Sequence, residues 1–217
     1  MNSTKIWDFW AHKYEKLWVQ KYSLKPTRKL ILEEIRKIAE NSDGKLEILD
    51  AGCATGQTIR MIKDNLPTDK VYCQGIDISP KMIEMAKNLD PEGFYECLDV
   101  AQMVLIPNKY NVIICTHSFP YYYRKEEILK NFSKMLTPDG YLIMVQASQN
   151  NLWDKIAMSF VKLTTSQAEY PSLLKMLKLI LATPFELENL KLLKEKFYMA
   201  SIFMFVCKNR KDSISEN

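Results

Sequence analysis

The chain has 217 residues, of which 47% are hydrophobic and 26% are charged. These values are typical of an ordinary soluble globular protein with one large or two small domains and a substantial core. The net charge is only +4 and no block of consecutive basic residues occurs, so we expect no nucleic acid partner.

The N-terminus and the cysteines predict a reducing location. No apolar run reaches the roughly 20 residues of a membrane span, and the first residues lack the apolar centre of a signal peptide. The five cysteines are odd in number, form no C-x-x-C pair and mostly lie in apolar runs. We therefore expect buried thiols rather than disulfides or a metal site, and a cytoplasmic protein with no membrane span.

Strand-like and helix-like segments alternate along the chain. The predicted helices cover residues 6–17, 26–40, 55–65, 79–89 and 125–136, and helical patterns fill 152–193 with breaks at Pro171 and Pro184. The predicted strands cover residues 44–52, 70–78, 93–100, 110–118, 141–148 and 197–208. This alternation favours a mostly parallel sheet with helices on both faces, whose ligands bind beyond the carboxyl ends of the strands.

The loop after the first long strand, in ILDAGCATGQT, indicates the kind of ligand. A phosphate-binding P-loop is excluded because no lysine follows Gly56 at the required place. A dinucleotide fingerprint is disfavoured because Ala54 and Gln57 occupy two of its three glycine positions. The spacing Gly52-x-Ala54-x-Gly56 still allows a close approach to a ligand, and Asp50 ahead of it suits a cationic ligand better than a phosphate.

Two further acids end the next strands. Asp77 follows the second strand, where a carboxylate can accept hydrogen bonds from both hydroxyls of a ribose. Asp99 follows the third strand, where a carboxylate could accept a hydrogen bond from the exocyclic amine of adenine. Each acid alone is more often a solvated residue at a strand end. Together with Asp50 and the glycine loop they indicate one binding site.

Five segments resemble, in order and at the usual spacing, the motifs of the class I S-adenosylmethionine-dependent methyltransferases: ILDAGCATGQT, GIDIS, CLDV, YNVIICTHSFPYY and MLTPDGYLIMV. The resemblance covers residues 14–145, and it departs from the family at Ala54 and Asp139, which replace glycines. It implies an α/β, Rossmann-like, seven-stranded and mostly parallel sheet with one antiparallel edge strand, helices on both faces and a helical cap. It also implies S-adenosyl-L-methionine as cofactor and a last pair of strands forming an edge hairpin, the first of them within 189–196 or very short.

The same resemblance implies the residue roles. Asp50 lies near the methionine end of the cofactor, Asp77 holds the ribose, Leu98 to Val100 flank the adenine, and carbonyl groups around Thr116 accept hydrogen bonds from the amino group. The implied cofactor-binding residues are Tyr14, Asp50, Gly52, Cys53, Ala54, Gly56, Asp77, Ile78, Asp99, Val100 and Thr116.

The acceptor is less well defined. Methyl transfer depends mainly on positioning, and a base is needed only if the nucleophile arrives protonated. His117, at the end of the fourth strand, is the candidate base or substrate ligand, and packing is the alternative. Ser118 and Phe119 replace the first two residues of the N-P-P-Y signature of methyltransferases acting on bases and glutamine, which disfavours those substrates. The candidate substrate contacts are Trp10, His12, Tyr121 and Tyr122.

We predict one domain over residues 1–208, with a helical lid at 1–40 and a helical cap at 148–188, followed by a flexible tail at 209–217. The lid carries an aromatic stripe of Trp7, Phe9, Trp10, Tyr14 and Trp18. The apolar segment YPSLLKMLKLILATPF in the cap is expected to roof the acceptor pocket, or to form a homodimer contact.

The predicted function is methylation of a small, partly apolar molecule. The alternatives are methylation of protein or RNA, and a non-catalytic protein that binds S-adenosylmethionine. An NAD-dependent oxidoreductase is disfavoured by the missing glycines.

Overall fold

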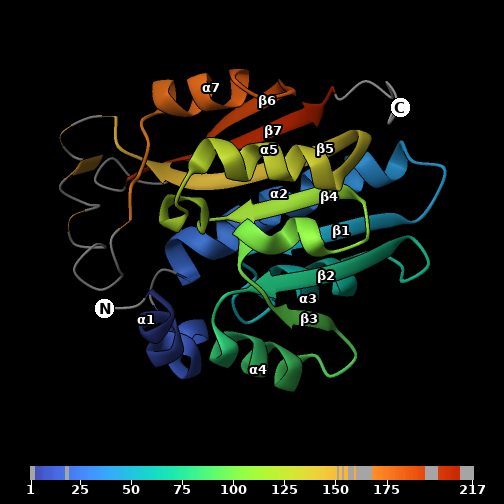
Figure 1. Ribbon diagram of the computed structural model, residues 1–217. Coiled ribbons are helices and arrows are strands. Elements are labelled where there is room, and N and C mark those ends of the chain that lie inside the picture. The colour runs from blue at the N-terminus through green and yellow to red at the C-terminus, as the bar shows by residue number, and fades with distance from the viewer. Residues whose placement is uncertain are drawn as a thin grey trace. The chain divides into compact units, whose positions relative to one another are not determined.

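The fold is a seven-stranded α/β sheet with the strand order β3-β2-β1-β4-β5-β7-β6, which confirms the predicted fold class (Figure 1). The computed structural model describes residues 3–17, 20–150, 152, 154–155, 159, 168–193 and 200–210. The chain divides into two compact units, Met1–Val100 and Ala101–Asn217. No helix in the described part of the chain is long and apolar enough to cross a bilayer.

The first unit contains three parallel strands. They are β1 (Leu46–Ala51), β2 (Val71–Asp77) and β3 (Phe94–Cys97). The helices are α1 (Ser3–Trp10), α2 (Lys25–Glu40), α3 (Gln57–Asn65) and α4 (Pro80–Leu89), with shorter turns η1 (Ala11–Lys16), η2 (Gln20–Leu24) and η3, which runs on into the second unit (Val100–Leu105). Because the strands are parallel, the loops that follow β1, β2 and β3 emerge at the same edge of this part of the sheet.

Local signals explain several of these boundaries. The Ser79 hydroxyl accepts a hydrogen bond of 3.2 Å from the backbone N–H of Met82, and Pro80 opens α4, as the sequence predicts. The predicted helix 6–17 is split, because α1 ends at Trp10 and the tighter turn η1 continues to Lys16. Helix α1 lies beside α4 (Figure 1).

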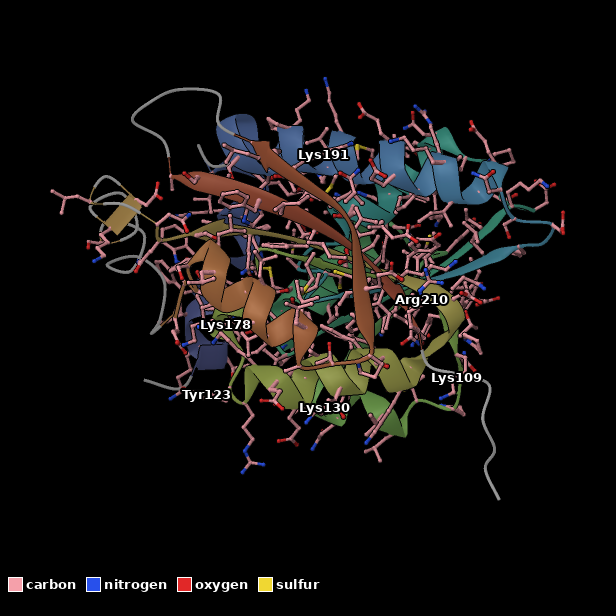
Figure 2. All side chains as sticks on the ribbon, turned by 90° about the horizontal axis from the view of Figure 1, so that it is seen from above. Lys109, Tyr123, Lys130, Lys178, Lys191 and Arg210 are labelled. Atoms are coloured by element: carbon pink, nitrogen blue, oxygen red, sulfur yellow. The ribbon has the colours of Figure 1, made fainter. Side chains whose placement is uncertain are left out.

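The second unit holds the other four strands. They are β4 (Tyr110–Thr116), β5 (Leu136–Ser148), β6 (Phe185–Leu193) and β7 (Ser201–Asn209). Strands β4 and β5 are parallel, whereas β7 runs antiparallel to both β5 and β6. Its helices are η4 (Phe119–Tyr121), α5 (Lys125–Met135) and α7 (Leu173–Leu181). Helices α5 and α7 lie side by side (Figures 1 and 2).

Strand β6 shows that the predicted helix over 185–193 is wrong. Phe185 and Leu187 alternate with exposed Glu186 and Glu188, which is the period of a strand. The pairing with β7 shifts register between Leu187 and Asn189, but the alternation of burial continues without a break to Leu193. Leu190 and Leu192 fall on exposed positions, so the hydrophobic pattern of the sequence does not follow the alternation of burial. The expected hairpin partner thus begins before residue 189, and the last four residues of the predicted cap belong to the sheet.

The cysteines are free, and four of the five are buried, as expected for structural thiols. Cys97 is the exception, because it ends β3 on an exposed position. Trp18, the N-terminal part of the last predicted strand, much of the predicted cap and nearly all of the predicted tail fall outside the described residues.

Candidate active site

The loop between β1 and α3 follows a tight path. Gly52, Ala54 and Gly56 have positive φ angles of 81°, 47° and 76°. A Cβ atom on Gly56 would lie 2.6 Å from the hydroxyl oxygen of Tyr95, so glycine is required there for space as well as for conformation. The loop thus brings backbone, rather than side chains, to the end of β1.

Asp77 anchors this loop from the end of β2. Its Oδ2 accepts a hydrogen bond of 2.9 Å from the N–H of Ala54, and its Oδ1 accepts one of 2.9 Å from the N–H of Ser79. Burial raises the pKa of Asp77, and these two bonds oppose the rise. Each oxygen has a second lone pair, so the carboxylate can still accept hydrogen bonds from a ligand.

Asp50 is a buried carboxylate with an unsatisfied oxygen. The residue is 1% exposed, and its Oδ1 has no hydrogen-bond partner among the described residues. Burial, reinforced by the charge of Asp77, raises the pKa of Asp50 to about 7, whereas the charge of Arg28 lowers it. An unpaired buried carboxylate is costly, so this site fits a ligand that brings positive charge or hydrogen-bond donors.

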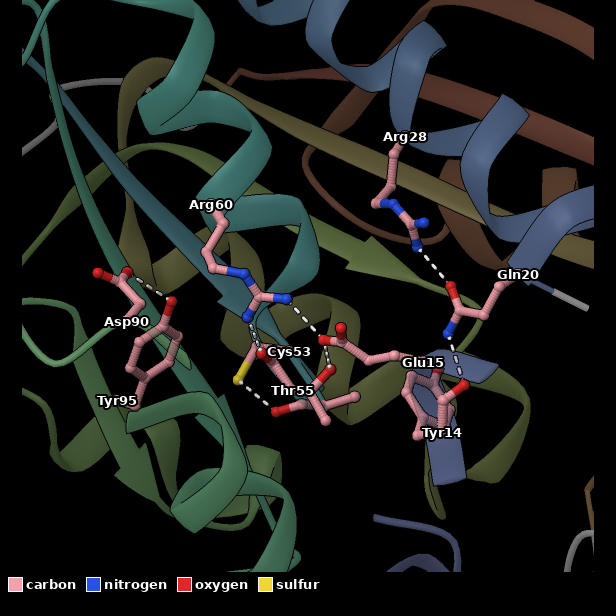
Figure 3. A network of polar contacts seen from close by, with 10 residues as sticks. Tyr14, Glu15, Gln20, Arg28, Cys53, Thr55, Arg60, Asp90 and Tyr95 are labelled. Carbon is pink, nitrogen blue, oxygen red and sulfur yellow. Dashed lines mark hydrogen bonds and ion pairs between the residues drawn. The ribbon is translucent and has the colours of Figure 1, made fainter. Parts of the chain in front are cut away.

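Arg28, on α2, supplies the opposite charge. Its Nη1 donates a 3.1 Å hydrogen bond to Oε1 of Gln20, whose Nε2 in turn donates one of 3.1 Å to the carbonyl oxygen of Tyr14 (Figure 3). Burial lowers the pKa of Arg28, and the charges of Glu15 and Asp50 oppose this shift. A guanidinium has five N–H donors, and among the described residues Gln20 takes one of them, so others can donate to an anionic ligand.

Glu15 fastens the N-terminal segment to the loop. Its Oε1 accepts hydrogen bonds of 2.9 Å from the hydroxyl of Thr55 and 2.5 Å from Nη2 of Arg60 (Figure 3). Arg60 also donates to the carbonyl oxygen of Thr55. In a second contact, the hydroxyl of Ser79 donates a hydrogen bond of 2.6 Å to Oδ1 of Asp8. The segment therefore contacts the loops that follow both β1 and β2.

The remaining predicted residues of the first unit differ in burial. Tyr14 and Trp10 are partly buried, whereas His12 is exposed on η1. After β2 and β3, Ile78 and Asp99 are exposed and Val100 is buried. The structure therefore places Tyr14 in the same network as Arg28 and leaves His12 on the surface.

In the second unit, His117 follows β4 in a strained conformation. Its φ of 57° lies in the left-handed region, and its N–H donates a 2.7 Å hydrogen bond to the carbonyl oxygen of Val145. Such conformations cost energy in residues other than glycine and are concentrated at functional sites. The side chain of His117 is partly buried. Beside it, the hydroxyl of Thr116 is buried without a hydrogen-bond partner among the described residues.

Two further unsatisfied polar side chains lie near the carboxyl end of β5. Gln146 and Ser148 are both 0% exposed, and neither the amide nor the hydroxyl has a hydrogen-bond partner in the described part of the chain. They alternate along the strand and so share one face. Buried polar groups of this kind usually have a water or a ligand as partner.

Sequence reasoning missed several of these polar residues. Glu15 had a signal, because it directly follows Tyr14, which is an implied cofactor-binding residue, and Gln146 had one as a polar residue inside an apolar strand. Arg28 had none, because an arginine on an amphipathic helix is normally a solvated residue. The missed residues are Glu15, Gln20, Arg28, Arg60, Gln146 and Ser148.

Comparison with known proteins finds similarity over the central part of the chain. Residues 49–142 match the family model described as a methyltransferase domain. A relative, malonyl-[acyl-carrier protein] O-methyltransferase of Acetivibrio thermocellus, is 32% identical over 104 residues. This match covers 47% of the present chain and 36% of the relative. The chain thus aligns with well under half of that relative's length.

Solved structures show the same fold. Magnesium protoporphyrin IX methyltransferase from Synechocystis PCC 6803, with bound SAH, has a TM-score of 0.73 at 16% identity and covers 96% of this chain and 100% of its own. The [4+2]-cyclase SpnF has a TM-score of 0.64 at 13% identity and covers 82% of this chain and 80% of its own. At such identities the likeness establishes the fold alone.

Proposed function

We propose that this protein transfers a methyl group from S-adenosylmethionine to a small, partly apolar acceptor, because residues 49–142 match a methyltransferase domain. One observation carries the proposal. The first motif contains a buried carboxylate, Asp50, whose unsatisfied oxygen fits a ligand with hydrogen-bond donors or positive charge.

The residues present fit this cofactor. Asp50 would accept from the ammonium group, and Arg28 would donate to the carboxylate of the same amino acid moiety. Asp77 would accept from the ribose hydroxyls, and Ile78 and Val100 would flank the adenine. The glycine loop lets the backbone approach the ligand closely. Tyr14 and Glu15 would hold the N-terminal segment over it.

The chemistry depends mainly on positioning. The bound cofactor supplies a methyl group that is already activated by its positively charged sulfur. Asp50 and Arg28 fix the orientation of that end, and the N-terminal segment excludes water. His117 would accept a proton from an acceptor that arrives protonated, and Thr116 would donate or accept a hydrogen bond beside it.

The acceptor is proposed to be a small molecule. The related proteins are named for methylation of a malonyl group on a carrier protein and of magnesium protoporphyrin IX. Tyr121 and Tyr122 are partly buried beside the end of β4 and would contact the acceptor. A second candidate is a different reaction on the same scaffold, since a [4+2]-cyclase shares this fold.

Calorimetric titration tests the cofactor assignment. We expect saturable binding of S-adenosylmethionine to the purified protein and none of NAD, which serves as the control. Transfer of a labelled methyl group to candidate acceptors would follow. Binding of NAD alone would contradict the proposal, and binding of S-adenosylmethionine without transfer to any acceptor would favour the second candidate.

The variant Gln146→Met tests whether the buried amide of Gln146 binds a ligand or only supports the fold. Gln146→Met keeps the volume and removes an unsatisfied buried amide, so the free energy of unfolding should rise by about 1 kcal/mol or stay unchanged. Methyl transfer to the acceptor should nevertheless fall, while affinity for S-adenosylmethionine is kept. Denaturant unfolding and steady-state kinetics measure the two effects. A destabilised variant would instead show that a buried water satisfies the amide.

A further inference from the structure

A hollow lies within the second unit, and the roles given above to Tyr121 and Tyr122 leave its charged residues unexplained. It has a volume of about 760 Å³, in the range of small-molecule sites. Its walls are the segment Pro120–Tyr123, the start of α5, Ala168 and Glu169, and Lys175 and Leu179 of α7. Figure 2 shows Tyr123 and Lys130 on this side, next to α7. We call it the tyrosine pocket.

Hydrogen bonds connect the segments that line the tyrosine pocket. The N–H of Glu169 donates a 2.9 Å hydrogen bond to the carbonyl oxygen of Pro120. The hydroxyls of Tyr121 and Tyr170 are 3.1 Å apart and hydrogen-bonded, and Tyr170 is only 9% exposed. These contacts join the residues before α7 to the loop after β4. The pocket is therefore formed in advance, which reduces the ordering cost of binding a ligand.

The charges around the pocket leave a surplus of one cation. Arg124 pairs with Glu127 at 3.4 Å and Lys130 pairs with Glu126 at 2.8 Å, so these ions neutralise each other. The other two cations, Lys125 and Lys175, share a single carboxylate, that of Glu169.

Lys125 has a nearly buried side chain, whereas the side chain of Glu169 is mostly exposed. The side chain of Lys125 is 9% exposed, and its Nζ donates a 2.9 Å hydrogen bond to the carbonyl oxygen of Tyr122. Its Nζ also lies 6.0 Å from the centre of the Phe119 ring. The Glu169 side chain is 60% exposed and can rotate away. Burial lowers the pKa of Lys125, while the charge of Glu169 opposes this shift. An anionic ligand could therefore take the place of the Glu169 carboxylate.

We propose that the tyrosine pocket binds the acceptor through an acidic group, with its anion between Lys125 and Lys175 and its apolar part against Tyr121, Tyr122 and Leu179. The acceptor would then be an aromatic or otherwise apolar acid. This inference rests on the proposed function for the identity of the ligand as acceptor. Glu169 acts as an internal competitor that occupies the anion site when no ligand is bound.

Binding of 2-naphthoate to the full-length protein tests the proposal, with neutral 2-naphthalenemethanol as the matched probe. Fluorescence or calorimetric titration should show saturable binding of the acid and much weaker binding of the alcohol. Lys175→Met should weaken binding of 2-naphthoate about tenfold, because it removes a charge-assisted hydrogen bond. Glu169→Gln should strengthen it several-fold, because the competing carboxylate is lost. Lys178→Met, on the same helix but outside the pocket lining, is the control and should change nothing (Figure 2).

Opposite effects of the two variants separate binding from folding. Damage to the fold would weaken binding in both Lys175→Met and Glu169→Gln, and circular dichroism of each variant checks this directly. Equal affinity for acid and alcohol, no binding of either, or weaker binding in folded Glu169→Gln would overturn the proposal. Titration of the same samples with S-adenosylmethionine keeps the two hypotheses apart. If the protein bound 2-naphthoate but not S-adenosylmethionine, the anion site would stand and the proposed function would be contradicted. If it bound S-adenosylmethionine but not 2-naphthoate, only the proposal for the tyrosine pocket would be contradicted.

Discussion

Replacement of Asp50 by asparagine is expected to weaken S-adenosylmethionine binding at pH 7.5 by about 10- to 150-fold, since a hydrogen bond to a charged group contributes about 1.5–3 kcal/mol. The variant keeps the size of the side chain and removes its charge. Asp64→Asn, an exposed position on α3, is the control and should bind as the natural protein does. Calorimetry measures both affinities.

The pH dependence of protein stability gives a second measurement on Asp50→Asn. Burial raises the pKa of Asp50 from 3.8 to about 7 in the folded protein. The folded state therefore keeps a proton that the unfolded state releases, so the stabilising contribution of Asp50 is full below pH 4 and is lost as the pH rises through 7. In Asp50→Asn this loss is absent. The stability of the variant relative to the natural protein should grow between pH 4 and 7, by roughly 3 kcal/mol at most.

The affinity for S-adenosylmethionine should rise with pH, whereas the contribution of Asp50 to stability falls with pH. The positive groups of S-adenosylmethionine favour the ionised form of Asp50, so binding below pH 7 releases its proton. Affinity should rise between pH 5 and 7, by up to about tenfold per pH unit, before an α-amino group of the ligand titrates near 8. Titrations in buffers of different ionisation enthalpy count the released proton. Equal proton release by Asp50→Asn would show that another group is responsible.

Asp77→Ala is expected to weaken S-adenosylmethionine binding by a similar 1.5–3 kcal/mol, about 10- to 150-fold. Asp77 differs from Asp50 in that it also accepts hydrogen bonds from Ala54 and Ser79, so the loop should loosen as well. The ribose contact can be isolated with S-adenosylhomocysteine and its 2′-deoxy analogue. The natural protein should prefer the ribose form, and Asp77→Ala should lose most of this preference.

Two observations would count against that role. If Asp77→Ala discriminated between the two analogues as strongly as the natural protein does, another residue would hold the ribose. If affinity did not change at all, the carboxylate would only support the loop. Thermal unfolding of Asp77→Ala, measured without ligand, reports the loop contribution separately.

The regular elements of the fold could be predicted from local patterns. Helix α4 carries its own cap in Ser79 and Pro80, and β4 is apolar enough to be recognised as a strand buried on both faces. Strand β6 could not be predicted in the same way. Its burial alternates regularly, but Leu190 and Leu192 lie on exposed positions, so the hydrophobic residues of the sequence follow neither a strand period nor a helix period.

The residues of the candidate site likewise fall into those that could be predicted from the sequence and those that could not. Asp50, Gly56 and Asp77 could be identified because they belong to short motifs at the ends of strands, where a parallel sheet places its ligands. Arg28 and Glu15 could not be assigned, since each depends on partners that are brought near only by folding. Glu15 forms an ion pair with Arg60, which lies in another part of the chain, and the charge of Asp50 acts on the guanidinium of Arg28.

The sequence by itself thus determined the alternation of strands and helices, the glycine loop and the acids at the strand ends, because these depend on near neighbours in the chain. Tertiary structure alone decided that Asp50 is buried with an unsatisfied oxygen. It also decided that Lys125 and Lys175 share the carboxylate of Glu169. The reason is that desolvation and charge pairing depend on which distant residues surround a group, and no local pattern encodes that environment.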